Sequence, residues 1–213
     1  MRIVLARHGE TPWNAEGRYQ GQIDIPLSDL GEQQARALGQ RLSDVVIDRA
    51  VASPLQRARR TAELALRERA GMLRLEPGLR EIAHGTWEGK LAGEIAERYP
   101  QQFQAWRDAP QTVQMPEGES LDQVFARVWP AFVRATAGLA PAQTLLVVAH
   151  DAVNRLILCH VLGIAFAQLW RFRQAPATLN LLEGPSAEQL DVVRLNDCAH
   201  HTGLFGEAVH RAL

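Results

Sequence analysis

The run Thr144–Ala149, which reads TLLVVA, is the strongest indication of a buried β-strand in this 213-residue chain. A continuous apolar run of this length is typical of a strand covered on both faces, as in a parallel sheet. Other short apolar runs predict further strands, at residues 2–6, 45–52, 72–75, 178–182 and 190–195. Segments with helical spacing lie between them, at 28–43, 55–70, 121–132 and 153–162. This alternation predicts an α/β fold, a three-layer α/β/α sandwich with a mainly parallel central sheet.

Two stretches interrupt this alternation. Residues 7–26 carry glycines and prolines that predict a loop, and residues 77–118 are irregular for the same reason. Within the second stretch, we interpret residues 82–117 as an insert that forms a lid or determines specificity. No repeat, low-complexity segment or linker divides the chain, so we expect a single domain over residues 1–213.

The charge balance and the cysteines argue against several classes of function. The formal net charge is −1, which gives no indication of a nucleic-acid or acidic-membrane partner. Only Lys90 of the 23 basic side chains is a lysine, so an anion site here has to be built from arginine. Cys159 and Cys198 provide neither a disulfide framework nor a metal-ligand spacing. The chain shows no signal peptide and no membrane-spanning stretch, and we expect a cytoplasmic protein without metal or cofactor.

The first predicted strand leads directly into Arg7, His8 and Gly9. A histidine at the carboxyl end of a strand can present its imidazole to a small ligand at the edge of an α/β sheet. The neighbouring arginine is suited to phosphate oxygens. The arrangement favours a nucleophilic histidine that accepts a phosphoryl group, although such a triplet taken alone is more often a polar residue near a turn.

Three other residues complete a possible phosphoryl-transfer site. His150 ends the strand at 144–149, where its imidazole can stabilise charge that develops on a phosphoryl oxygen. Arg57 lies in the first turn of a predicted helix, where the helix dipole favours an anion. Glu81 precedes a glycine-rich run and could protonate a departing alkoxide. The ordinary alternatives are a histidine that caps the sheet, a solvated arginine, and a surface carboxylate paired with Arg80.

Four blocks of the sequence resemble the histidine phosphatase superfamily, in its phosphoglycerate-mutase-like branch. They occur in the family's order and spacing, from Ile3 to about His200, and so cover nearly the whole chain. The blocks are Arg7-His8-Gly9-Glu10-Thr11 with Trp13-Asn14 close behind, Ser53-Pro54-Leu55-x-Arg57-Ala58, Leu79-x-Glu81 with Gly85-x-Trp87-Glu88-Gly89, and Val148-Ala149-His150. The resemblance implies a phosphoglycerate-mutase-like fold.

The resemblance also implies a role for each of the catalytic candidates. His8 would be the phosphorylated nucleophile. Arg7, Arg57 and His150 would form the phosphate pocket. Glu81 would be the proton donor, first to the leaving oxygen and then, as a base, toward the attacking water.

Further positions match the family's substrate-binding residues. Asn14 matches a position that contacts the phosphate, and Gln20 and Gly21 match a segment at the pocket rim. His84 could bind a substrate carboxylate or another polar group, or could only shape a glycine turn. The chain departs from the family at Asp151, where glycine usually follows the second histidine. This carboxylate could repel the substrate or orient a neighbouring group.

The resemblance to the family is compatible with two activities, that of a hydrolase and that of a mutase. Cofactor-dependent phosphoglycerate mutases carry a longer basic insert with an adjacent arginine pair after a tryptophan, whereas this chain reads Trp106-Arg107-Asp108. Only Arg98 and Arg107 are basic in residues 94–117. This favours a metal-independent phosphomonoester hydrolase with a phosphohistidine intermediate. The motifs look most like those of phosphoserine phosphatases, and α-ribazole phosphatases share several of them.

We expect Trp87, Trp106 and Trp170 to pack in the core rather than line a pocket. The expected partner is a small-molecule phosphate ester, and a homodimer is an expectation at the level of the family alone. A protein phosphatase and a non-catalytic interaction protein are minor alternatives, since fold does not determine function.

Overall fold

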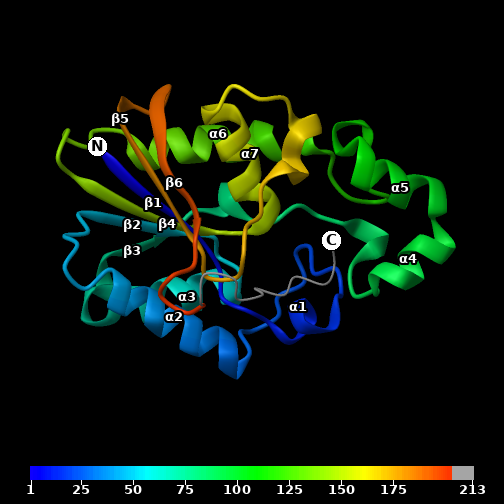
Figure 1. The fold of residues 1–213 in the computed structure, drawn as a ribbon, viewed down its shortest axis with the longest axis horizontal. Helices are drawn as coiled ribbons and strands as arrows, with labels where there is room; N and C mark the ends of the chain where they lie inside the picture. Colours follow the sequence, from blue (N-terminus) through cyan, green and yellow to red (C-terminus); the bar gives the residue numbers. More distant parts are fainter. Residues whose placement is uncertain (203–213) are drawn as a thin grey trace.

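The computed structural model describes residues 1–202, and these contain a six-stranded sheet in the order β3-β2-β4-β1-β5-β6 (Figure 1). The strands β3, β2, β4 and β1 run parallel to one another, while β5 pairs antiparallel with β1 and forms an antiparallel hairpin with β6. The prediction of a mainly parallel sheet is confirmed. The strands are β1 (Arg2–Arg7), β2 (Arg49–Ala52), β3 (Leu73–Leu75), β4 (Thr144–Ala149), β5 (Leu179–Ser186) and β6 (Gln189–Asp197).

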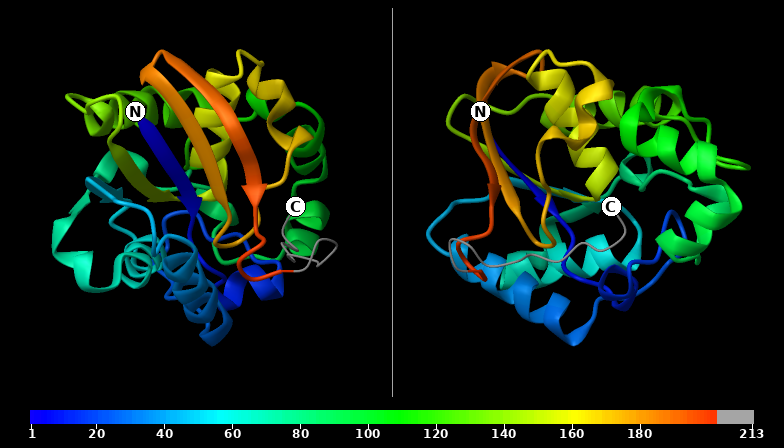
Figure 2. Two further views of the ribbon diagram at one scale, coloured as in Figure 1. Left: turned by 60° about the vertical axis from the view of Figure 1, so that its left-hand side comes forward. Right: turned by 45° about the vertical axis from the view of Figure 1, so that its right-hand side comes forward.

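Helices cover both faces of the sheet (Figures 1 and 2). On β4, Leu146 and Val148 pack with α2 and α3, whereas Leu145 and Val147 pack with α6 and α7 on the opposite face. All six residues of β4 are therefore buried, which explains the uninterrupted apolar run. The three-layer sandwich is confirmed. Its covering helices are α2 (Asp29–Arg41), α3 (Gln56–Leu66), α6 (Leu121–Thr136) and α7 (Asp151–Val161).

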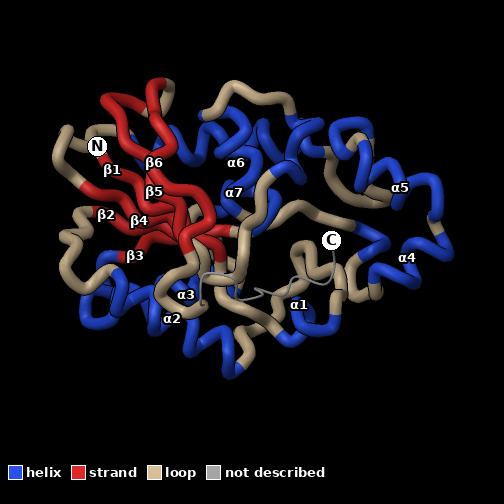
Figure 3. Tube along the Cα trace, in the orientation of Figure 1, coloured by secondary structure: helices blue, strands red, loops and turns tan. Residues whose placement is uncertain are grey.

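Two segments predicted to be irregular contain helices. The expected loop 7–26 includes α1 (Pro12–Glu16), and the insert 82–117 includes α4 (Ala92–Arg98) and α5 (Pro100–Asp108) (Figure 3). The loop prediction is wrong for α1 and α5 because a proline can begin a helix as well as break one, and for α4 because this helix has only 7 residues. Pro12 and Pro100 instead occupy the first turns of α1 and α5, where the missing N–H has no intrahelical partner to lose. Within the described residues, no helix has the length and apolar character needed to cross a membrane.

The register of the parallel strands brings three chain segments to one edge of the sheet. Arg7 of β1 lies opposite Ala149 of β4, and Ala52 of β2 lies opposite Val148. Beyond the strand ends, the His8 N–H donates to the Ala149 carbonyl at 3.0 Å, and the Ser53 N–H to the Val148 carbonyl at 3.0 Å. The segments that carry His8, Arg57 and His150 therefore leave the sheet side by side.

The loop after β1 lies against the first turn of α2, and Gly31 makes this approach possible. A Cβ atom at Gly31 would lie 2.0 Å from the Glu10 carbonyl oxygen. We expect Gly31→Ala to lower the free energy of unfolding by about 1–3 kcal/mol. The clash outweighs the gain of about 1 kcal/mol that alanine brings to a helix. Urea denaturation measures the change.

Gly93 in α4 is the matched control, because a Cβ atom there would meet nothing within 4 Å. Gly93→Ala is expected to raise the free energy of unfolding by about 0.5–1 kcal/mol. Equal stabilisation by both substitutions would contradict the close approach of Glu10 to α2.

Candidate active site

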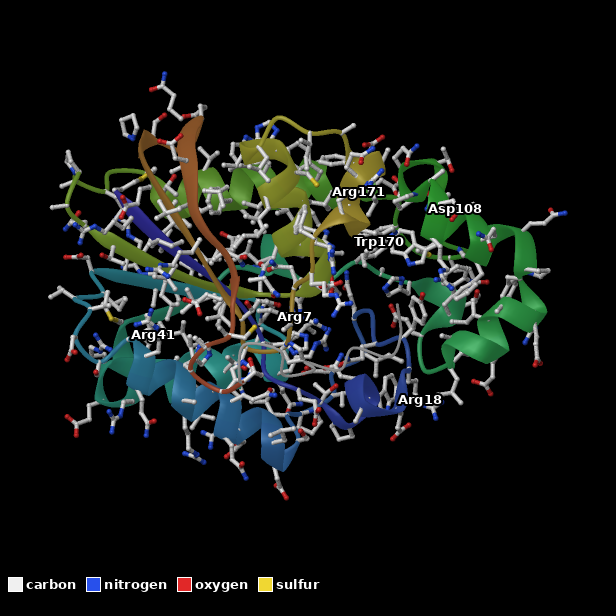
Figure 4. All side chains as sticks on the ribbon, viewed as in Figure 1. Arg7, Arg18, Arg41, Asp108, Trp170 and Arg171 are labelled. Atoms are coloured by element: carbon white, nitrogen blue, oxygen red, sulfur yellow. The ribbon has the colours of Figure 1, made fainter. Side chains whose placement is uncertain are left out.

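A pocket lies where β1 and β4 end, and residues from distant parts of the chain line it. Figure 4 labels Arg7 at the end of β1, Arg18 after α1, and Trp170 in the 3₁₀ segment Phe166–Arg171. Eight of the nine residues expected at the site line this pocket, and His150 contacts one of them, His8. The lining residues are Arg7, His8, Asn14, Arg18, Tyr19, Gln20, Gly21, Arg57, Glu81, His84, Trp106, Asp151, Ala152 and Trp170.

The imidazole of His8 is held in one orientation by its own neighbour. Its Nδ1 lies 2.7 Å from the Gly9 carbonyl oxygen. Because a carbonyl only accepts, Nδ1 carries the proton and Nε2 carries the lone pair. Gly9 is fixed in turn, since its N–H donates to Thr61 Oγ1 at 3.0 Å. The result is an oriented imidazole with a basic Nε2, the form that a nucleophile needs.

His150 lies beside His8 at the N-terminus of α7. The two ring centroids are 5.2 Å apart with an interplanar angle of 60°. His150 is fully buried, and within the described chain neither ring nitrogen has a hydrogen-bond partner. Burial, followed by the positive charge of Arg57, lowers the pKa of His150 well below its usual range. A neutral ring retains one N–H, which can donate to a ligand oxygen.

Arg7 and Arg57 are both buried, and backbone carbonyls anchor their guanidinium groups. Arg7 NH1 donates to the Gln174 carbonyl, and Arg57 NH2 donates to the Gly21 carbonyl at 2.7 Å. Burial lowers the pKa of Arg7, and lowers that of Arg57 to about 10. Arg57 therefore stays charged at neutral pH. The Nε atom of each arginine has no partner within the described residues.

Asn14 is oriented by the cap of α1. The Thr11 N–H and hydroxyl both donate to Asn14 Oδ1 at 3.1 Å, and the Asn14 N–H donates to Thr11 Oγ1. These contacts fix which side of the amide is oxygen. Nδ2 is then the free side, and it has no partner in the described part of the chain. A donor is therefore available at the pocket wall.

Glu81 is buried, and backbone N–H groups hold both of its carboxyl oxygens. Oε1 accepts from the Ile82 N–H at 2.9 Å, and Oε2 accepts from the Ala152 N–H in the first turn of α7 at 3.4 Å. Burial raises the pKa of Glu81, and the negative charge of Asp151 raises it further, whereas Arg57 and Arg7 act in the opposite direction. The net upward shift suits a proton donor. The alternative of a surface carboxylate paired with Arg80 is wrong.

Gln20, Gly21 and His84 form the wall next to Arg57. Gly21 has a φ of +53°, which favours glycine, and a Cβ atom there would lie 1.9 Å from Glu88 Oε1 and displace that side chain. Burial lowers the pKa of His84 to about 3, and the ring is therefore neutral at physiological pH. It can offer a hydrogen bond to a substrate but no full positive charge.

Several buried polar atoms around the pocket thus have hydrogen-bonding capacity that the described residues do not satisfy. Within residues 1–202, the Nε atoms of Arg7 and Arg57, Nδ2 of Asn14 and both ring nitrogens of His150 have no partner. Burying an unsatisfied donor costs about 1–3 kcal/mol. Such a set is complemented by a ligand with several acceptor oxygens and negative charge. No group of three or more His, Cys, Asp or Glu among these residues is arranged to hold a metal ion.

The sequence reasoning missed part of the pocket. The prediction that Trp106 and Trp170 pack in the core is wrong in part, because both also line the pocket, with ring centroids 5.2 Å apart. Trp87 does pack in the core. Arg18 and Tyr19 were not predicted, although they directly precede the predicted rim residues Gln20 and Gly21, and this proximity is the signal that could have found them.

Comparison with known proteins gives a consistent result. The model of the histidine phosphatase superfamily (branch 1) matches residues 3–198. Phosphoserine phosphatase 1 of Hydrogenobacter thermophilus is 34% identical over 214 residues, which cover 100% of both chains. The adenosylcobalamin/alpha-ribazole phosphatase of Salmonella typhimurium is 34% identical over 173 residues, covering 81% of this chain and 85% of that protein. The solved structure of Bacillus stearothermophilus YhfR has a TM-score of 0.85 and 31% identity, and covers 93% of this chain and 98% of its own.

The chain therefore belongs to the histidine phosphatase superfamily, branch 1. It is an enzyme of the phosphomonoesterase type. The resemblance carried by the four sequence blocks and the phosphoglycerate-mutase-like fold are confirmed.

Proposed function

We propose that this protein hydrolyses a small phosphorylated metabolite through a phosphohistidine formed on His8. One observation carries the proposal. An oriented imidazole with a basic Nε2 lies at a pocket where Arg7 Nε, Arg57 Nε, Asn14 Nδ2 and the ring nitrogens of His150 are buried without a hydrogen-bond partner among residues 1–202. A phosphoryl group supplies the acceptor oxygens and the negative charge that this set of donors requires.

In the first step, His8 Nε2 attacks phosphorus in line with the ester oxygen. The N–P bond forms and the P–O bond to the alcohol breaks. Arg7, Arg57, Asn14 and His150 donate to the equatorial oxygens, where charge accumulates in the transition state. Protonated Glu81 transfers its proton to the departing oxygen, and a neutral alcohol leaves.

In the second step, water attacks the phosphohistidine. The Glu81 carboxylate, now ionised, takes a proton from this water, and the N–P bond breaks to release inorganic phosphate. Glu81 ends protonated and His8 ends neutral, so both return to their starting forms. The arginines and His150 supply the positive charge and the N–H donors, and we propose that no metal ion takes part.

The proposed substrate is a phosphoserine-like ester or α-ribazole phosphate, which the two curated relatives are named for. The insert 82–117 contributes to the choice, because its residues His84 and Trp106 line the pocket. We propose that it acts as the lid or specificity segment. For such metabolites we expect the cytoplasm as the site of action.

The basic residues of the insert favour hydrolysis over phosphoglycerate mutase activity. Arg98 and Arg107 are both exposed, and Lys90, the other basic residue of the insert, donates to the Thr86 carbonyl; none of the three lines the pocket. Retention of a phosphoacid during transfer between two positions needs cations close to it. This insert offers none of its own to the pocket.

Phosphate release in the presence of EDTA tests the substrate and the absence of a metal together. We expect preferential turnover of phosphoserine or α-ribazole phosphate over 3-phosphoglycerate, and rates unchanged after removal of divalent metal ions. Loss of activity with EDTA and recovery with added metal would contradict the proposed chemistry. Interconversion of 2- and 3-phosphoglycerate in the presence of the bisphosphate, without phosphate release, would reassign the enzyme as a mutase.

A further inference from the structure

Asp151 is an unusual acidic residue in an anion pocket. It is the first residue of α7, directly follows His150, lines the pocket, and is 7% exposed. An unpaired carboxylate here would repel a phosphate ester. The arrangement of its neighbours shows why it is tolerated.

Arg155 holds the Asp151 carboxylate in place. Its Nε lies 3.1 Å from each of the two carboxyl oxygens, one helical turn away. Its NH1 donates to the carbonyls of Leu169, at 2.9 Å, and Phe172. Its guanidinium stacks over Trp170, 5.0 Å from the ring centroid. With this many contacts, Arg155 is rigid and neutralises one side of Asp151.

The other side of Asp151 faces the reacting groups. Its Oδ1 lies 3.7 Å from Arg7 NH1, an ion pair between two buried side chains. The next residue, Ala152, donates its N–H to Glu81 Oε2. Asp151 and Glu81 therefore share the N-terminus of α7, where two ionised carboxylates would repel one another.

We propose that Asp151 is a positioning residue: its carboxylate, held by Arg155, fixes the Arg7 guanidinium at the phosphoryl group and keeps Glu81 in the protonated form that donates to the leaving oxygen. This inference rests on the proposed function, because it adds a partner to the groups that bind phosphate and donate the proton. It gives a function to Asp151, which stands where glycine usually follows the second histidine.

The charges around Glu81 determine the direction of the expected effect. Arg7 of β1 and Arg57 of α3 favour its ionised form, and Asp151 of α7 favours its neutral form. Arg127 of α6 donates to the Glu81 carbonyl at 2.9 Å and adds further positive charge nearby. The histidines around the same pocket are His8, His84 and His150. Removing the charge of Asp151 leaves only burial to oppose the cations and therefore lowers the pKa of Glu81 from its value in the parent enzyme.

The test is the pH dependence of kcat/KM for Asp151→Asn, which retains an oxygen acceptor for Arg155. An alkyl phosphate needs the acid, so its activity should decline at lower pH than in the parent enzyme, with a loss of about tenfold at neutral pH. An aryl phosphate should lose less, because its leaving group needs little protonation. The titration of the substrate itself is common to both enzymes and cancels in the comparison.

Three further variants show whether a change in the pH profile is due to Asp151. Asp191→Asn removes the same charge from an exposed site on β6 and should leave the pH profile unchanged. The double variant Asp151→Asn/Arg155→Gln also removes the buried Arg155 charge that the single variant leaves without its carboxylate, and should show the same shift even where the single variant folds poorly. Glu81→Gln, measured alongside, tests the proton donor itself.

The results separate this inference from the proposed function. If Glu81→Gln loses alkyl-ester activity but both Asp151 variants keep the parent's pH profile, with equal losses on alkyl and aryl esters, Asp151 is only structural and the inference is overturned. If Glu81→Gln retains alkyl-ester activity, the proposed mechanism fails and this inference fails with it.

Discussion

Replacing His8 by alanine is expected to abolish phosphate release while the protein remains folded. Without Nε2 no phosphohistidine can form, and the loss should reach at least about 10³-fold for every ester. The hydrogen bond of the side chain to the Gly9 carbonyl is local, and its ring contact with His150 lies at the pocket rather than in the apolar core, so we expect the variant to fold. Steady-state phosphate release and thermal unfolding of the same preparation measure the two effects.

His160→Ala is the matched control for this variant. His160 is an exposed histidine on α7, packed against Trp129 with ring centroids 4.1 Å apart, and it lies outside the pocket. It should retain parental activity. Near-parental turnover by folded His8→Ala would eliminate His8 as the nucleophile.

Replacing Glu81 by glutamine is expected to separate good leaving groups from poor ones. The amide keeps the shape of the side chain but has no proton of suitable acidity to give. For an alkyl phosphate, kcat/KM should fall by about 10²–10⁴-fold. For an aryl phosphate, kcat/KM should fall by less than about tenfold, because the phenolate leaves without full protonation.

Hydrolysis of the phosphohistidine, the second step, gives an independent kinetic test of the Glu81→Gln variant. Glu81 also acts as the base toward water, so Glu81→Gln should accumulate the phosphoenzyme and release an initial burst of phenol from the aryl substrate. Glu188→Gln, at an exposed site in the turn between β5 and β6, should behave like the parent. Equal losses of kcat/KM on both esters, without a burst, would remove Glu81 from the acid–base role.

The pH dependence of alkyl-ester hydrolysis should follow the protonation of Glu81. Burial and Asp151 raise the pKa of Glu81, and the first step uses its protonated form. Alkyl-ester activity is therefore expected to be retained below this pKa and to fall as the pH rises through it. The upward shift extends the active range toward neutral pH.

Much of the fold could be predicted from the sequence because its signals are local. The run at 145–149 is apolar throughout because α2 and α3 cover one face of β4 while α6 and α7 cover the other. The first-turn prolines of α1 and α5 and the short length of α4 resemble loop signals, so these helices were missed. Helix α1 matters for the site because its cap orients Asn14.

The sequence by itself determined the centre of the candidate site. His8 and His150 follow apolar strands, and Arg57 opens the helix after another; parallel strands end at the same edge, so these residues had to meet there. The motif that includes Glu81 indicated this residue as the proton donor. The placement of His8, His150 and Arg57 depends on periodicity and order along the chain, whereas that of Glu81 depends on the resemblance of its motif to the family.

The tertiary structure alone decided what surrounds that centre. Whether Trp106 and Trp170 reach the pocket depends on the path of the insert and of the segment 166–171, which no local pattern encodes. The same holds for Asp151, whose charge would be unfavourable in an anion pocket without Arg155 on one side and Arg7 on the other. Burial and partners determine what a charged side chain does, and both are properties of the folded chain.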